Sequence, residues 1–485
     1  MGHLDSGDFS RAAAGCLLLA LTMASAAPAD AFAAQVRTGR YRGDLTDPAT
    51  GQVLMRVAMQ VPQELPAAKH LGLLFLFHGF KGHENNYIGL TVEALKRLQL
   101  LDQYVVISGK SKGPGWTTAD DDAVLGVMRW ARQTYPIDPR RVFLFGSSNG
   151  AAYVGRFGSA HQELIAGVVG YCGNYRFDPA LKDRPAGARN EWYFVHGGKD
   201  RPENSRRACA TLKELGYRYV FRQMDGYGHT DIWDSIGHPD RTKADAVRDD
   251  WILWLHALRH KTIAPTPAEV RTLAALGEKL RAARVAEVNG LLGEAERIGG
   301  APAGKVIVAA LASADPGVRR AAAKTTVRTL YDGSVIARLI QLLADESADV
   351  RQAAVEGLTT AANWRDAGAQ AALSRRARSS DAPLEDRLRA VAGLGRASRL
   401  ALLGNCEDGL LVWSLVRLLD DDHPRVREAA FAALEKQVPD TFGYRPDLTG
   451  QQRRAVMGKW RQWCREKCGP ESDPLRQDKE GGQDP

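Results

Sequence analysis

A serine between two glycines is the first feature of the sequence that could carry chemistry. Gly146, Ser148 and Gly150 form a Gly-x-Ser-x-Gly pattern. By itself the pattern is weak, because a chain with 48 glycines matches it easily by chance. Its context is more specific: a short apolar run over 140–145 precedes it, and small, helix-compatible residues follow it. We therefore predict a nucleophilic serine on a sharp strand-to-helix turn; a purely structural tight turn is the alternative.

A serine nucleophile needs a general base and a carboxylate that orients this base. In doubly wound hydrolases the acid and then the histidine follow the serine along the chain. Asp200 comes after one later apolar run, and His229 comes after the next. Asp225 and Asp231 are competing carboxylates, but both are too near His229 in sequence to come from a separate strand. We predict a catalytic triad of Ser148, Asp200 and His229.

The negative oxygen that forms during acyl transfer needs two backbone N–H donors. One donor is expected from Asn149, the residue after the nucleophile. The other is expected from Phe80, which follows an earlier apolar run and the residues His78 and Gly79. His78 is interpreted as shaping this loop, and His196, at a later strand end, as structural. This chemistry needs no metal and no organic cofactor, and the absence of Cys-x-x-Cys pairs argues against zinc.

The residues around these motifs predict an α/β domain over about 35–262. Short apolar runs alternate with helical patterns, which is typical of a mainly parallel, doubly wound sheet with helices on both faces. In such sheets ligands bind beyond the carboxyl ends of the strands, where all three triad residues fall. The predicted strands contain the runs "VLMRVAMQVP", "LGLLFLFHG", "YVVIS", "RVFLFG", "AGVVGYCG", "EWYFVHGG" and "RYVFRQMDG".

This first half resembles the α/β-hydrolase superfamily, and within it the secreted esterases related to polyhydroxyalkanoate depolymerases and feruloyl esterases. The resemblance implies a serine carboxylic-ester hydrolase whose substrates include polymer- or polysaccharide-linked esters. Ala151 and Ala152 depart from it, because the family often has glycine and methionine there. It rests on "YPIDPRRVFLFGSSNGAAY" over 135–153 and on His78-Gly79, Ser148-Asn149-Gly150, His196-Gly197 with Asp200, and Gly228-His229.

The second half is predicted to be all-helical and repetitive. Acidic turn residues followed by an apolar residue, an arginine and paired alanines recur at intervals of roughly 30 to 40 residues, the length of a helix-pair repeat. The region 300–468 resembles HEAT or armadillo-like repeats; one irregular helical bundle is the alternative. A linker and helical hairpin (263–299) precede it, and the tail 469–485 is expected to be disordered. The apolar anchors of the copies are Val318, Val350, Leu388 and Val426.

An arginine follows each of these anchors, and two roles are open for the set. The arginines can bond the acidic turn of a neighbouring repeat, such as Asp345 or Asp422, as an internal ladder. Alternatively they form an outward basic stripe for an acidic polymer or protein, since stacked repeats present long surfaces to partners. Because every triad member precedes the linker, we also expect a catalytic domain separable from the repeats. The arginines are Arg319, Arg351, Arg389 and Arg427.

The N-terminal segment 1–34 reads as an export signal. An apolar stretch over 12–23 is followed by small residues that suit cleavage. The stretch is short for a bilayer span, and no other segment approaches a membrane helix, so we expect an exported, periplasmic or extracellular protein without a membrane span after cleavage. Export implies an oxidising compartment, in which Cys172 and Cys209 are candidates for a disulfide; buried free thiols fit equally well.

Charge and composition narrow the function classes. The net charge is +8 with scattered lysines and arginines, which indicates a solvated surface, and we expect no nucleic-acid partner. The leading hypothesis is a secreted serine esterase with a helical repeat module that binds an unknown protein or polymer. A serine peptidase on the same fold is one alternative. A binding or scaffold protein, in which the repeats carry the function, is the other.

Overall fold

The structure, a computed structural model, describes residues 36–468 apart from 68–69, 232–240, 260–262, 326–332, 365, 402–408, 436–437 and 439. The predicted signal segment 1–34 and the predicted disordered tail 469–485 lie outside the described residues. None of the described helices is both long and apolar enough to cross a membrane.

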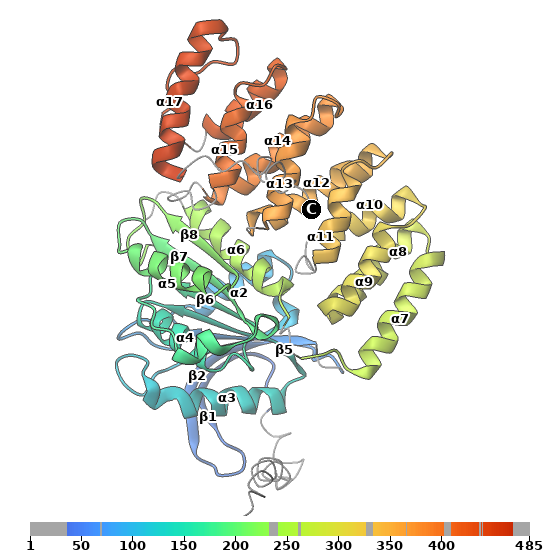
Figure 1. The fold of residues 1–485 in the computed structure, drawn as a ribbon. Coiled ribbons are helices and arrows are strands. Elements are labelled where there is room, and N and C mark those ends of the chain that lie inside the picture. Colours follow the sequence, from blue (N-terminus) through green and yellow to red (C-terminus); the bar gives the residue numbers. More distant parts are fainter. Residues whose placement is uncertain are drawn as a thin grey trace, which may run out of the picture.

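The N-terminal half folds around one eight-stranded sheet (Figure 1). Its strands lie in the order β1-β2-β4-β3-β5-β6-β7-β8. β2 is antiparallel to β1 and β4, and all other neighbouring pairs are parallel. The strands are β1 (Gly39–Thr46), β2 (Val53–Val61), β3 (Leu71–Phe77), β4 (Tyr104–Gly109), β5 (Ile137–Ser147), β6 (Gly167–Tyr171), β7 (Glu191–Gly197) and β8 (Tyr219–Met224).

Helices cover both faces of this sheet, because the inner strands are apolar on both sides. Every residue of β3 is buried, for example, with alternate side chains facing two separate apolar clusters. One cluster contains the apolar faces of α2 (Ile88–Arg97) and α6 (Arg241–Ala257). The other contains α3 (Asp121–Thr134), α4 (Asn149–Ala160) and α5 (Glu203–Glu214). The predicted doubly wound α/β fold is confirmed.

Two features of this half were outside the sequence prediction. β1 is an edge strand whose alternating residues are half-exposed, so its sequence "GRYRGDLT" lacks the continuous apolar run that marks the inner strands. In the described connections between the larger elements there are four short 3₁₀ helices. They are Leu101–Gln103, Thr118–Asp120, Pro179–Asp183 and Ala186–Ala188.

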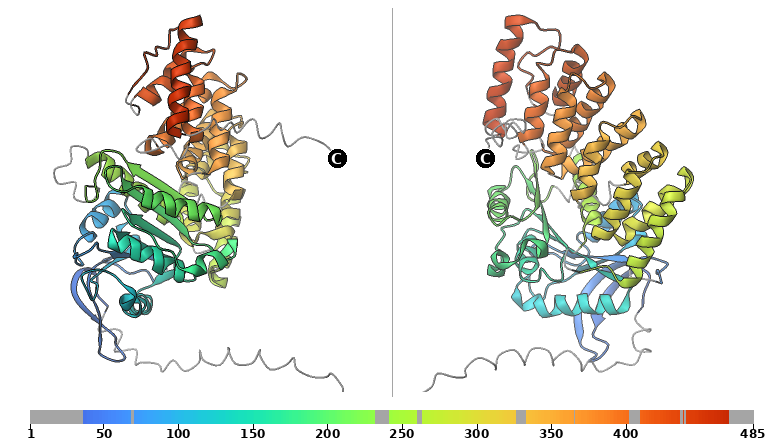
Figure 2. Two further views of the ribbon diagram at one scale, coloured as in Figure 1. Left: turned by 60° about the vertical axis from the view of Figure 1, so that its left-hand side comes forward. Right: turned by 45° about the vertical axis from the view of Figure 1, so that its right-hand side comes forward.

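The C-terminal half is a two-layered stack of helices that arches over the sheet (Figures 1 and 2). In one layer α8, α10, α12, α14 and α16 contact one another in turn, and in the other layer α7, α9, α11, α13, α15 and α17 do so. This regular order is that of stacked helix pairs. The helices are α7 (Pro267–Ala282), α8 (Val285–Ile298), α9 (Gly300–Leu311), α10 (Pro316–Thr325), α11 (Gly333–Leu342), α12 (Ala348–Asn363), α13 (Ala367–Arg378), α14 (Leu384–Ala401), α15 (Gly409–Leu418), α16 (Pro424–Glu435) and α17 (Gly450–Cys468).

Arginines that follow the repeat anchors point inward and connect consecutive turns. Arg319 at the start of α10 donates from Nε to the carboxylate of Asp345 in the next turn, at 2.8 Å. Arg351 at the start of α12 donates in the same way to Asp386, at 2.5 Å. Each guanidinium also donates to carbonyl oxygens of the turn before its own helix. The predicted internal ladder forms at these two positions.

The third member of the ladder is Arg387, and the sequence alignment on Leu388 and Arg389 was wrong. Arg387 is buried and donates from Nη2 to Asp421 at 2.5 Å. Arg389 is 35 % exposed and bonds Asp386 within its own helix. In this copy Asp386 occupies the anchor position before Arg387, so the apolar pattern pointed instead to Leu388 and Arg389, two residues later.

Among the residues that the structure describes, Arg427 has no carboxylate partner, and it ends the ladder. Its guanidinium donates to the carbonyl oxygens of Asp421, Asp422 and Pro446. The ladder arginines are therefore occupied inside the stack, and they do not form the outward basic stripe that was the alternative.

A buried cluster joins the two halves of the chain. Asp250 on α6 accepts hydrogen bonds from Tyr193 on β7, from Arg222 on β8 at 3.2 Å, and from Asn363 at 2.7 Å and Trp364 at 3.0 Å, at the end of α12. Arg222 also donates to the Asn363 carbonyl oxygen at 2.6 Å. In this buried ion pair Arg222 lies on the sheet and Asp250 lies on α6. Two of the four residues that donate to Asp250, namely Asn363 and Trp364, belong to the repeats.

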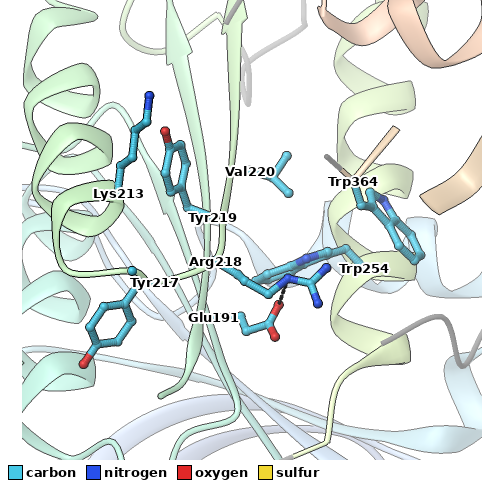
Figure 3. A pocket seen from close by; sticks show the side chains of 9 residues that line it. Glu191, Lys213, Tyr217, Arg218, Tyr219, Val220, Trp254 and Trp364 are labelled. Atoms are coloured by element: carbon cyan, nitrogen blue, oxygen red, sulfur yellow. Dashed lines mark ion pairs between the residues drawn. The ribbon is translucent and has the colours of Figure 1, made fainter. Parts of the chain in front are cut away.

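The apolar core is also continuous across this junction. A single cluster runs from strand residues of the sheet through α6 into helices α7 to α17. A cleft of about 270 Å³ remains between the halves, lined by Trp254 and Trp364 and by the pair Glu191–Arg218 (Figure 3). It lies at the amino ends of β7 and β8, away from the triad. This shared core does not support the expectation of a separable catalytic domain.

We predict that Asp250→Asn lowers the free energy of unfolding by about 3–5 kcal/mol, because it leaves the Arg222 guanidinium buried without its counter-charge. Urea unfolding followed by circular dichroism measures the loss. The matched control is Asp249→Asn on the same helix, whose partner Arg97 is 42 % exposed; its cost is expected below about 1 kcal/mol. Equal losses for the two variants would contradict a buried ionic joint.

The ladder generates a second prediction. Arg319→Leu should lower stability by about 3 kcal/mol, whereas its neighbour Arg320→Leu should cost less than about 1 kcal/mol, because Arg319 is 8 % exposed and Arg320 is 49 % exposed. Thermal unfolding of the two variants measures the difference.

The contribution of the Arg319–Asp345 contact to stability depends on pH, and the direction of this dependence can be predicted. Burial alone would raise the pKa of Asp345, but the hydrogen bond from Arg319, that from the Ser347 amide and the charges of Arg319 and Arg351 together outweigh it, and the pKa is lowered. Such a carboxylate stabilises the fold fully at neutral pH, and its contribution is lost as the pH falls through the carboxyl range. The gap between wild type and Arg319→Leu should therefore narrow in acid; a gap that widens there would contradict the ladder.

Candidate active site

Ser148 lies on the turn between β5 and α4 in a strained conformation. β5 ends at Ser147 and α4 begins at Asn149, so the turn is a single residue with φ 55° and ψ −116°. A positive φ is costly for a residue with a side chain and is found where structure enforces it. Glycine is required on either side, because a Cβ on Gly146 would collide with the Gly150 carbonyl group and one on Gly150 with the Phe77 carbonyl oxygen. The turn raises the serine hydroxyl above the sheet.

The structure brings the three predicted triad residues together. The Ser148 hydroxyl donates to His229 Nε2 at 2.8 Å, and His229 Nδ1 donates to Asp200 Oδ2 at 2.7 Å. Each residue follows the carboxyl end of a different parallel strand, namely β5, β7 and β8. The imidazole is 44 % exposed and the Asp200 side chain 19 % exposed. The site is thus open on the histidine side and sheltered at the carboxylate.

A second histidine holds the carboxylate from behind. His196, near the carboxyl end of β7, is fully buried, and its Nε2 donates to Asp200 Oδ2 at 3.0 Å. Its Nδ1 accepts from the Ser205 hydroxyl at 2.7 Å. Burial lowers the pKa of His196, so the ring is neutral and keeps this donor arrangement. The sequence interpretation of His196 as structural missed this contact, because the hydroxyl that orients the ring comes from α5.

The charge on Asp200 is stabilised by these donors. Burial alone would raise the pKa of Asp200, but the hydrogen bonds and charges of His229 and His196 outweigh it, and the pKa is lowered. The two competing carboxylates have other partners. Asp231 accepts from the Gly228 amide at 2.6 Å and so shapes the histidine loop, and Asp225 accepts from Gln223 at 2.8 Å.

Two backbone amides are available for the oxyanion. Within the described part of the chain, the amides of Phe80 and Asn149 donate no hydrogen bond. The loop that carries Phe80 packs against the nucleophile, because a Cβ on Gly79 would lie 3.3 Å from the Ser148 Cβ. The Asn149 side chain accepts from the Trp116 amide at 2.6 Å, which ties a third loop to the turn.

His78 maintains the shape of the Phe80 loop. It is fully buried, and its Nδ1 donates to the Gly79 carbonyl oxygen at 2.7 Å. Its Nε2 accepts from the Ser111 amide at 3.2 Å. Burial lowers the pKa of His78 and keeps it neutral. The interpretation of this histidine as a loop-shaping residue agrees with these contacts.

Cys172 lies directly behind the triad and is not joined to Cys209. Both cysteines are buried thiols, and they belong to the two apolar clusters on opposite faces of the sheet. The disulfide considered from the sequence is therefore absent from this structure. Cys172 has a positive φ of 50° just beyond β6. Burial, reinforced by the negative charge of Asp200, raises the pKa of its thiol to about 12.

Among known proteins, solved structures are similar to part of this chain. No protein-family model matches it, and no curated protein matches it. Among solved structures, a substrate-bound fluorophosphonate-binding serine hydrolase of Staphylococcus aureus is 14 % identical over 45 % of this chain and 98 % of its own, with a TM-score of 0.36. An S-formylglutathione hydrolase of the same organism is 15 % identical over 45 % and 99 %, with a TM-score of 0.35.

Est1E from Butyrivibrio proteoclasticus is a third such structure, 15 % identical over 45 % of this chain and 99 % of its own, with a TM-score of 0.33. The first two of these neighbours are hydrolases by name. The similarity covers less than half of the chain at low identity, so it leaves substrate and reaction to the residues of the site.

We predict that His196→Ala lowers kcat for the reaction of this site by about tenfold to a hundredfold, the worth of a charge-assisted hydrogen bond of about 1.5–3 kcal/mol. KM should change little, because the lost donor acts on Asp200 and not on substrate. His196→Gln, whose amide nitrogen reaches the position of Nε2, is the matched control and should recover part of the rate. A purely structural role would instead lower both variants equally together with their unfolding midpoints.

Proposed function

We propose that this protein is a serine hydrolase that cleaves carboxylic esters through an acyl-enzyme intermediate. The observation that carries the proposal is the unbroken hydrogen-bonded chain from Ser148 through His229 to Asp200, with the serine on a strained single-residue turn. A hydroxyl, a neutral imidazole and a carboxylate in this order are what acyl transfer to serine requires.

In the first half of the reaction, Ser148 Oγ attacks the ester carbonyl carbon. His229 Nε2 accepts the hydroxyl proton as the bond forms, and Asp200 stabilises the positive imidazole through its Nδ1–H. The developing negative oxygen is bound by the amides of Asn149 and Phe80, which have no other acceptor within the described part of the chain. The tetrahedral intermediate collapses, His229 protonates the leaving alcohol, and an acyl-Ser148 ester remains.

In the second half, water replaces the alcohol. His229 Nε2 takes a proton from this water, which attacks the acyl-Ser148 carbonyl, and the same two amides bind the second oxyanion. The proton then returns to Ser148 Oγ as the acid product leaves. Asp200 keeps its charge throughout, which its lowered pKa favours.

The surroundings of the nucleophile suit an accessible ester. The His229 side chain is 44 % exposed and Phe80 is 61 % exposed, so an aromatic residue is open to solvent at the expected oxyanion donor. Such a site accepts esters attached to a large body, and the proposal therefore includes polymer- and polysaccharide-linked substrates. From its N-terminal sequence we further propose that the protein is exported.

We predict that a fluorophosphonate probe labels the wild-type protein and that Ser148→Ala abolishes both labelling and hydrolysis of short-chain aryl esters. Loss of the nucleophile should cost roughly six decades of turnover. Mass spectrometry of the labelled peptide identifies the modified residue. Ser147→Ala, at the neighbouring buried position, is the matched control and should still be labelled.

Labelling of the Ser148→Ala protein would refute the assignment. A peptide panel measured beside the ester panel separates the two hydrolase hypotheses, because both use the same triad: faster turnover of peptides than of aryl esters would move the proposal to a peptidase. Labelling of Ser148 without turnover of either class would favour a binding function.

A further inference from the structure

A cysteine sulfur, which could bind a metal ion, lies next to the triad. Cys172, Asp200 and His229 each place one ligand atom within 4.8 Å of the others'. Cys172 reaches this position because it follows β6, the strand between those that carry the serine and the acid, and because its own amide is held by the Val195 carbonyl oxygen at 2.9 Å. Its positive φ is a further cost that the fold accepts to keep a side chain there.

The donor set has a definite metal preference. A thiolate, an imidazole and a carboxylate together suit borderline and soft divalent cations such as Zn²⁺ and Cd²⁺, whereas Mg²⁺ and Ca²⁺ prefer oxygen ligands alone. Three protein ligands with one open position also match the tetrahedral habit of such cations, whose fourth ligand is then water. The exposed edge of His229 provides the route of entry.

We propose that a thiophilic divalent cation binds between Cys172 Sγ, Asp200 and His229 Nδ1 and reversibly inactivates the enzyme. The inhibition rests on the proposed function, whereas the cation site itself rests only on the three side chains.

Inhibition follows from the proton balance of binding. The cation forms bonds to sulfur, nitrogen and a carboxylate oxygen, and the Cys172 thiol loses its proton to solvent. The proton on His229 Nδ1 must leave that nitrogen, and the neutral ring then carries it on Nε2. Nε2 now donates and cannot accept the Ser148 proton, so the general base is lost without any change in oxidation state.

The test titrates Cd²⁺ into the full-length wild-type protein, Cys172→Ser and Cys209→Ser. Cadmium–thiolate coordination gives ultraviolet charge-transfer absorbance, a readout independent of activity. Aryl-ester hydrolysis is followed in parallel, each variant relative to its own metal-free rate, with Mg²⁺ as the control cation and a chelator to test reversal.

We expect wild type and Cys209→Ser to gain the absorbance and to be half-inhibited at the same Cd²⁺ concentration. Cys172→Ser should lack this absorbance step. Its half-inhibition should need at least about tenfold more Cd²⁺, because one of three protein ligands is gone. Equal titrations of wild type and Cys172→Ser by both readouts would overturn the proposal, as would inhibition by Mg²⁺ at the same concentrations.

The experiment distinguishes a failure of the esterase proposal from a failure of the cation-site proposal. A wild-type protein that gains the thiolate absorbance but hydrolyses no ester would refute the esterase and leave the cation site standing. If Cys172→Ser does not fold, His229→Ala replaces it in equilibrium dialysis with Cd²⁺: loss of one tight site relative to wild type supports the proposal, and retention of that site overturns it.

Discussion

The active site depends on backbone segments that approach within van der Waals contact at the carboxyl edge of the sheet. Gly150 in the first turn of α4 lies against the end of β3, and Gly197 at the end of β7 lies against the Gly228 carbonyl group. A side chain at either position would separate loops that must touch. Because β5, β7 and β8 all end at the same edge of a parallel sheet, these two contacts bring a serine, a carboxylate and an imidazole to one point.

Asp200 is the electrostatic centre of this arrangement. It is partly buried, which by itself disfavours a charged carboxylate, and the structure surrounds it with donors from His229 and His196. Burial raises the thiol pKa of Cys172, and the negative charge of Asp200 raises it further, which keeps that sulfur protonated. One carboxylate therefore orients the base and helps to keep its neighbour Cys172 a neutral thiol.

The repeats are part of the same folded body. β8 leads to the histidine loop, and the Arg222 side chain of β8 is held by Asp250 and by the end of α12. A buried guanidinium is tolerated only with a compensating carboxylate and full hydrogen bonding, so the sheet and the helical stack stabilise each other at this point. The arginine ladder applies the same principle between turns of the stack, where partly buried acidic residues are neutralised by arginines of the preceding repeat.

Much of the fold was predictable from the sequence. The alternating pattern of β2 and the short continuous apolar runs of β3 to β8 predicted the sheet, since strands covered on both faces are apolar on both sides. The recurring acidic turn and paired alanines predicted the helix stack. The convergence of Ser148, Asp200 and His229 was predictable from their order beyond three separate strands, because chain order and the parallel sheet together place such residues on one edge.

Other features depended on contacts between residues distant in sequence. The edge strand β1 is half-exposed and has no apolar run to mark it. Arg387 rather than Arg389 joins the ladder because it reaches Asp421 of the next turn, although the apolar pattern points two residues later. Cys172 and Cys209 lie in separate cores because β6 and α5 direct them to opposite faces of the sheet, and cysteine spacing carries no information about faces. The position of Cys172 behind the triad was decided by tertiary structure alone, since it follows from which strands are neighbours in the sheet.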